Sequence, residues 1–91
     1  MDIRIQAIHF DISEKLTAFI NKKVEKLVHR YPELNTIEAT LKVVKPETAK
    51  NKEVVLQAGE IAATKIADSF EEAVDLALEA IERQLEKRKN K

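Results

Sequence analysis

The chain has 91 residues, the length of one small domain, and its 16 Lys and Arg balance its 16 Asp and Glu. With no net charge, bulk electrostatics favours neither a nucleic acid nor a membrane as partner. The absence of cysteine excludes disulfides and thiolate chemistry, and a single glycine excludes a glycine-rich phosphate loop. No apolar run approaches the roughly 20 residues of a membrane span. The first residues also lack the apolar stretch of a signal peptide. We therefore expect a cytoplasmic protein.

The first half of the chain is predicted to form a strand, a helix and a second strand. Residues 3–8 begin with alternating apolar and polar side chains, which is typical of a strand. Residues 14–31 place apolar side chains three and four positions apart, which predicts an amphipathic helix that Ser13 caps and Pro32 ends. Residues 36–45 alternate again and predict a half-buried strand.

The second half is predicted to form two more strands and a helix. A polar hairpin loop at 46–51 leads to strands at 52–58 and 61–67, with a short turn at Gly59 between them. The last helix begins after Ser69. This serine, with a glutamate three positions later, forms the pattern of a capping box.

The order β-α-β-β-β-α predicts an α+β fold. Each helix has one apolar stripe, so both must cover the same face of a four-stranded mixed sheet, which gives a two-layer sandwich. The first two strands, joined through a helix, should be parallel with a right-handed crossover. We expect one domain over residues 1–91, with a tail at 86–91 that frays.

Basic side chains gather on one flank of the first helix. At about 100° per residue they fall between roughly 220° and 340° from Leu16, whereas Glu14 and Glu25 fall near 160–180°. The members of this basic flank are Lys15, Lys22, Lys23, Lys26, His29 and Arg30. Like charges four positions apart, such as Lys22 and Lys26, cost a few tenths of a kcal/mol. Such a cluster is easier to understand if it binds an anion.

The second helix separates its charges along its length. Residues 68–82 hold six acids and no base, and residues 83–91 hold five bases and one acid. Arg83 and Lys87 fall near 220–260° from Phe70. Much of this pattern suits the helix macrodipole. A second explanation is that the basic flank of one helix forms ion pairs with the acidic flank of the other, or is simply solvated.

The remaining polar residues do not suggest an enzyme. His9 and His29 lack metal-ligand spacing, and both serines fall at helix starts, where they act as caps. The acids are spread along exposed faces, with no pair in an apolar pocket. We expect no catalytic residue, no metal, no cofactor and no small-molecule substrate.

The chain resembles a known family along essentially its whole length. Ile12-Ser13-Glu14 and Leu16, followed by Lys23 and the pair Lys26-Leu27, resemble the opening of the bacterial ribosome hibernation-promoting factors and the related translation inhibitors. The segment IERQLEKRK at 81–89 resembles the family's ending and is its most distinctive part. The family's first strand usually ends in Gly followed by a basic residue and His or Asn, whereas this chain has Ala-Ile-His at 7–9 and so lacks a basic residue at position 8.

The resemblance implies a short family member that binds the small ribosomal subunit and its 16S-type rRNA. It would lie across the mRNA channel and the A- and P-site tRNA positions, keep idle ribosomes inactive as part of a stress response, and be monomeric when free. Matching positions give Lys23, Lys26, Arg83, Gln84, Lys87 and Lys89 as RNA-facing residues, with His29 near a position that is usually basic. Lys22 and Arg30 join this candidate set because they belong to the basic flank.

Two other functions stay open at this point. The chain could be a protein-interaction module that forms a homodimer through its polar sheet face or an edge strand, with charges that only keep it soluble. It could also bind double-stranded RNA, because that fold too has helices on one face of a small sheet.

Overall fold

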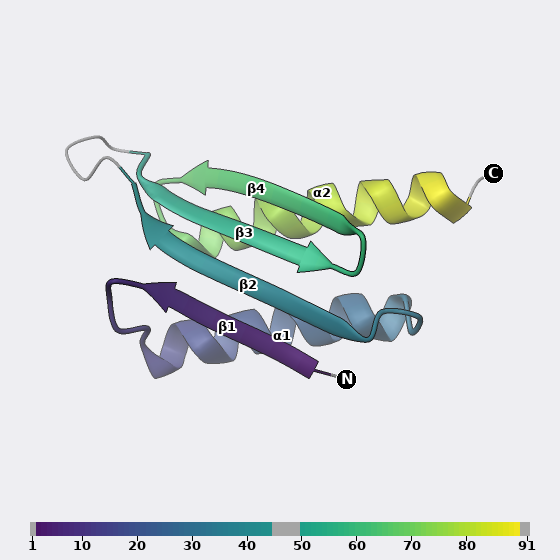
Figure 1. Cartoon of the computed structure of the whole chain (residues 1–91), viewed down its shortest axis with the longest axis horizontal. Helices are drawn as coiled ribbons and strands as arrows, with labels where there is room; N and C mark the ends of the chain where they lie inside the picture. The colour runs from purple at the N-terminus through teal and green to yellow at the C-terminus, as the bar shows by residue number, and fades with distance from the viewer. Residues whose placement is uncertain (1, 45–49, 90–91) are drawn as a thin grey trace.

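The structure is a computed structural model that describes residues 2–44 and 50–89, apart from the side chain of Lys89. Its elements follow the predicted order (Figure 1). They are β1 (Asp2–Ile8), α1 (Glu14–Arg30), β2 (Thr36–Val43), β3 (Lys52–Ala58), β4 (Ile61–Ala67) and α2 (Phe70–Lys89). Most of the predicted hairpin loop at 46–51 lies outside the described residues.

The four strands form one sheet in the order β1-β2-β3-β4. β1 and β2 are parallel, as predicted from the helical crossover, and the other two pairs are antiparallel. The register places Ile5, Ala39, Leu56 and Ala63 in one row across the sheet. Both helices cover the same face, which confirms the two-layer α+β prediction (Figure 1).

The two helices run in the same direction. Each follows a strand, β1 or β4, and these strands point the same way because two antiparallel pairings separate β4 from β2. Each helix then returns along the sheet, so α1 and α2 lie parallel (Figure 1). This parallel arrangement brings corresponding turns of the two helices opposite each other.

Both serines cap helices, as the sequence predicted. The backbone N–H of Leu16 donates to Ser13 Oγ at 3.1 Å, and the backbone N–H of Glu72 donates to Ser69 Oγ at 3.2 Å. Each serine thus satisfies a backbone donor that has no partner within its helix. The start of both helices is therefore fixed locally by sequence.

One apolar core lies between the sheet and the helices. Ile20 and Val24 of α1 and Val74 of α2 are fully buried against the inward side chains of the strands, such as Leu41 and Leu56. Burial of each such side chain stabilises the fold by about 1.5–3 kcal/mol. The helices are therefore held to the sheet by apolar contact along their predicted stripes.

Two residues after strand ends have positive φ angles. Gly59, in the predicted turn between β3 and β4, has φ 64°, which glycine adopts without steric cost. His9, directly after β1, has φ 62°. A side chain at that φ costs roughly 1–2 kcal/mol.

Helix α2 continues to Lys89, into the tail at 86–91 for which fraying stays a prediction. Among the described residues, neither helix is long and apolar enough to cross a membrane.

Candidate nucleic-acid interface

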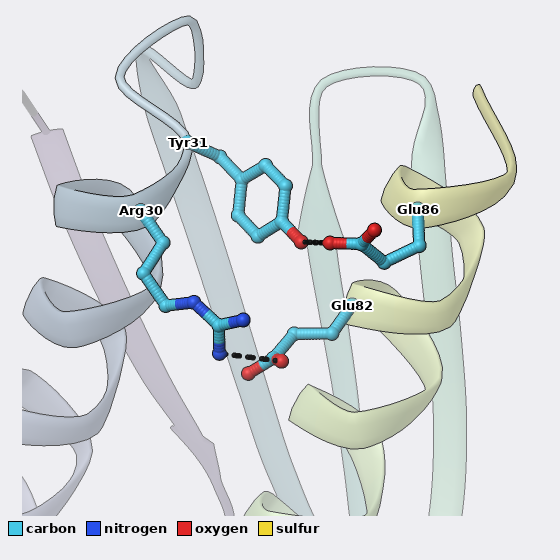
Figure 2. Close-up of polar contacts among 4 residues, drawn as sticks. All are labelled: Arg30, Tyr31, Glu82 and Glu86. Carbon is cyan, nitrogen blue, oxygen red and sulfur yellow. Dashed lines mark hydrogen bonds and ion pairs between the residues drawn. The ribbon is translucent and has the colours of Figure 1, made fainter. Parts of the chain in front are cut away.

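Two ion pairs join the helices, and we call them the seam: they link Lys23 and Arg30 of α1 to Asp75 and Glu82 of α2. Lys23 Nζ lies 3.4 Å from Asp75 Oδ1. Arg30 Nη1 lies 3.0 Å from Glu82 Oε2 (Figure 2). On each helix the two partners are seven positions apart, which is about two turns, so both pairs form along the same line of contact. The basic flank of α1 therefore faces the acidic flank of α2.

Tyr31 closes the seam at the C-terminal end of α1. Its hydroxyl donates a hydrogen bond to the carboxylate of Glu86, beside the Arg30–Glu82 pair (Figure 2). The hydrogen bond to Glu86 raises the pKa of the Tyr31 phenol, and burial raises it further. The Tyr31 side chain thus combines a buried ring with a polar end that reaches α2.

The ion pairs of the seam are open to solvent. The side chains of Lys23 and Arg30 are 37% and 60% exposed. Exposed pairs of this kind typically contribute about 0–1 kcal/mol to stability. Their main consequence is the placement of charge: two cations of the candidate set already have carboxylate partners.

Three other candidates form an outer ridge on α1, which consists of Lys22, Lys26 and His29. All three side chains are exposed, and within the described residues none of them has an ion pair. Lys26 also lines the shallow groove between the helices, together with Glu79 of α2. The outer ridge and Lys15 are therefore the parts of the basic flank that have no ion pair among the described residues.

On α2 the available cations lie beyond an acidic strip. Asp75 and Glu82 fall at roughly 120–140° from Phe70, and Arg83 and Lys87 at roughly 220–260°, so the two bases lie farther from α1 than the acids do. Both bases are exposed and have no ion pair among the described residues. The helix layer thus presents two separate basic strips rather than one continuous patch.

Gln84 has a contact that the sequence did not predict. Its side-chain amide donates to the backbone carbonyl of Ala62 at 3.3 Å. Ala62 belongs to β4, an edge strand of the sheet. The amide therefore satisfies one acceptor at an otherwise open edge. The last candidate, Lys89, ends α2, and its side chain lies outside the described residues.

The sequence does not predict the Tyr31–Glu86 contact, because helical periodicity places Tyr31 in the apolar stripe of the first helix. It did anticipate that one helix's basic flank could pair with the other's acids, but it did not identify the partners. The seven-residue spacing shared by Lys23 and Arg30 and by Asp75 and Glu82 was the available signal. Among the residues that the structure describes, no group of three His, Cys, Asp or Glu could hold a metal ion.

Comparison with known families decides the classification. The model of the family described as "Sigma 54 modulation protein / S30EA ribosomal protein" matches residues 3–91. The chain belongs to this family. The S30EA family comprises ribosome hibernation factors rather than enzymes, which confirms both the resemblance and the non-enzymatic prediction.

Individual S30EA relatives match along nearly their whole length. The chain is 29% identical to the ribosome hibernation promoting factor of Escherichia coli strain K12 over 91 residues, which is 100% of this chain and 96% of the relative. The same figures hold for the factor from Shigella flexneri.

Solved structures agree with the fold. A ribosomal subunit interface protein from Coxiella burnetii superposes with a TM-score of 0.81 and 26% identity, over 100% of both chains. The N-terminal domain of Thermus thermophilus Protein Y gives a TM-score of 0.72 at 17% identity, over 96% of this chain and 98% of the domain, and supports the fold alone.

Proposed function

We propose that this protein binds the small ribosomal subunit in the cytoplasm and inactivates idle ribosomes by occupying the decoding region. The observation on which this rests most is the match to a hibernation promoting factor over the full chain and 96% of the relative. The similar structure from Coxiella burnetii, described as a ribosomal subunit interface protein, supports the same assignment. On this account inhibition is by occupancy, so no reaction is needed.

The contacts proposed are between unpaired cations and rRNA phosphates. Folded rRNA is recognised mainly through its shape and its phosphates, for which positioned Lys and Arg suffice. The outer ridge and the pair Arg83 and Lys87 supply such groups on the exposed side of the helix layer. We assign these residues, with Lys89 at the helix end, as the rRNA-facing set. Lys23, Arg30 and Gln84 already have partners within the protein.

The contact of Gln84 with Ala62 argues against one alternative function. Strand addition to a sheet edge requires free backbone acceptors and donors. At β4 one acceptor is engaged by the Gln84 amide. A homodimer through the β4 edge would have to displace the Gln84 side chain or share this acceptor with it, whereas the β1 edge and the sheet face are not affected.

Co-sedimentation with purified small and large subunits over a salt series tests the proposal. The protein should pellet with small subunits and leave large subunits unoccupied. The variant removes four charges from the assigned set: Lys22→Gln, Lys26→Gln, Arg83→Gln and Lys87→Gln. The matched control removes four charges from strands and a loop: Arg4→Gln, Lys42→Gln, Lys50→Gln and Lys65→Gln.

The two variants have the same net charge, so a difference reports where the charges lie and, at Arg4 and Lys42 of the control, their ion pairs with Asp2 and Glu53. Each lost phosphate contact flattens the log K against log salt slope by about 0.7–0.9, so the first variant should lose about three units of slope. The control should keep the slope of the unmodified protein. Equal losses in both variants would show that binding depends on total charge and would refute the assigned face.

A further inference from the structure

We infer that Asp75 and Glu82 are specificity-determining residues: by binding Lys23 and Arg30, they withhold two cations from RNA that is not the target. The inference rests on the proposed function, because specificity here means preference for the small subunit over other RNA. It concerns the acids of α2, whose role the proposed rRNA contacts do not explain.

The seam engages Lys23 and Arg30 without burying them. Their side chains stay 37% and 60% exposed while their charged ends lie 3.4 and 3.0 Å from carboxylate oxygens. An RNA phosphate could therefore reach either cation if the carboxylate were neutral. While the carboxylate is charged, a phosphate must displace it and also approach a second negative group.

If Asp75 and Glu82 were neutral, the cations of the seam would extend the basic surface of the outer ridge. Without the pairs, Lys23 and Arg30 would add to the outer ridge, and α1 would present five adjacent basic side chains beside the groove. A continuous basic surface binds nucleic acid of any sequence through phosphate contacts. With the pairs in place, the basic side chains of α1 that lack an ion pair among the described residues are Lys15 and the outer ridge. Discrimination is a difference of affinities, so weakening the wrong complex is as effective as strengthening the right one.

The seam geometry supports this role better than a role in stability. Solvent-exposed ion pairs add little to folding, and the helices are held to the sheet by buried apolar side chains. Both acids lie on the flank of α2 that faces α1, two turns apart, where each meets one cation. Their placement therefore affects the surface potential more than the fold.

The test measures binding of the double variant Asp75→Asn and Glu82→Gln to an RNA duplex of about 16 base pairs, a generic probe long enough to span successive grooves. The control variant, Glu38→Gln with Glu60→Gln, has the same net charge but removes acids from the far sheet face and the β3–β4 turn. Thermal unfolding confirms that both variants are folded.

The seam variant should bind the duplex roughly tenfold more tightly than the unmodified protein, with a salt slope steeper by up to about two. The control should stay within about threefold of the unmodified protein, because neither Glu38 nor Glu60 forms an ion pair with a seam cation among the described residues. If the two variants bind the duplex equally, or neither differs from the unmodified protein, the inference is wrong.

A charge exchange separates pairing from the mere presence of acids. Lys23→Asp with Asp75→Lys keeps the net charge and allows the pair to re-form in the opposite sense. It should bind the duplex as weakly as the unmodified protein, whereas Asp75→Asn alone should bind more tightly. Tight binding by the exchanged variant would overturn the inference.

Small-subunit sedimentation of the same proteins keeps the two proposals distinct. The seam variant should gain less affinity for small subunits than for the duplex. Its preference for small subunits over the duplex should therefore be lower than that of the unmodified protein. If the unmodified protein does not pellet with small subunits at all, the proposed function fails. The duplex measurements still decide whether the acids mask Lys23 and Arg30.

Discussion

Helix α1 meets the sheet through uncharged side chains, whereas its contact with α2 adds exposed ion pairs to the buried side chains of Leu27 and Leu78. Toward the sheet it buries Ile20 and Val24 completely. Toward α2 it presents Lys23 and Arg30, which stay partly exposed while paired with carboxylates. The two contacts lie on the same helix and differ in what they can contribute: burial of apolar surface gives stability, whereas exposed ion pairs give mostly a pattern of charge.

This difference explains why a chain with no net charge can still have a basic surface. The acids of α2 neutralise the cations nearest to them and leave the outer ridge of α1 uncompensated. Arg83 and Lys87 lie beyond the acidic strip on the other helix. The charge available to a polyanion is therefore decided by the register of α1 against α2 and not by composition.

The largest expected effect is a loss of stability, which compares the apolar contact of the helices with the sheet against the seam. Leu56→Ala, at a side chain only 1% exposed, should lower the free energy of unfolding by about 2–5 kcal/mol. Arg30→Gln should lower it by no more than about 1 kcal/mol. Urea denaturation of both variants measures this. A loss at Arg30 as large as that at Leu56 would show that the seam, too, holds the fold together.

The second prediction compares the outer ridge with the seam in binding. Lys22→Gln with Lys26→Gln should weaken small-subunit binding roughly tenfold and flatten the salt slope by about 1.5. Removal of the complete pairs, by Lys23→Gln, Arg30→Gln, Asp75→Asn and Glu82→Gln, should have a smaller effect, because those cations already have partners and no unpaired acid is left behind. Sedimentation at several salt concentrations distinguishes the two. A larger effect at the seam would reverse our assignment of the binding residues.

The third prediction concerns the helix starts, where the stabilising contact is one local hydrogen bond rather than apolar burial or an ion pair. Ser13→Ala and Ser69→Ala should each lower the free energy of unfolding by about 1 kcal/mol, because each leaves a backbone N–H unsatisfied. Ser13→Thr keeps a capping hydroxyl and should recover most of the loss. Chemical denaturation tests this, and an unchanged midpoint for both alanine variants would show that the caps are dispensable.

The smallest expected effect is at the end of the seam and depends on pH. The hydrogen bond to Glu86 raises the pKa of Tyr31 above its ordinary value of 10.0, so the folded state favours the neutral phenol. The resulting stabilisation is complete below pH 10 and is lost as pH rises through the raised pKa. Tyr31 is the single tyrosine, so the ultraviolet absorbance of tyrosinate reports its titration directly.

Two variants serve as controls for this titration. Glu86→Gln should lower the pKa of Tyr31 toward 10.0, because the negative acceptor is gone. In Tyr31→Phe, the part of the stability loss at high pH that comes from ionisation of the Tyr31 phenol should disappear. A Tyr31 pKa at or below 10.0 in the unmodified protein would contradict the contact seen in Figure 2.

The sequence predicts the fold well because each element has a local signal. Each signal depends only on residues close together in the chain. Examples are the alternation at 36–45, the apolar stripe at 14–31 and the serine before each helix. The parallel pairing of β1 and β2 then follows from the helix that connects them. These signals need no knowledge of what lies on the other side of the molecule.

The site is less predictable because its contacts join distant parts of the chain. Helical periodicity places Lys23 and Arg30 on a basic flank, but only the register against α2 shows that they meet Asp75 and Glu82. Gln84 illustrates the same limit: the resemblance assigns it to RNA, whereas its amide bonds Ala62 on a strand more than 20 residues away. Residue patterns give the available charges, and tertiary packing decides which of them are already used.

Binding of tRNA to mRNA-programmed small subunits, measured at increasing concentrations of this protein, tests the central claim most directly. If the protein occupies the decoding region, tRNA binding should fall in step with occupancy by the protein, and the variant lacking Lys22, Lys26, Arg83 and Lys87 charges should need a much higher concentration. Simultaneous, undisturbed binding of tRNA and the unmodified protein on the same subunit would contradict it.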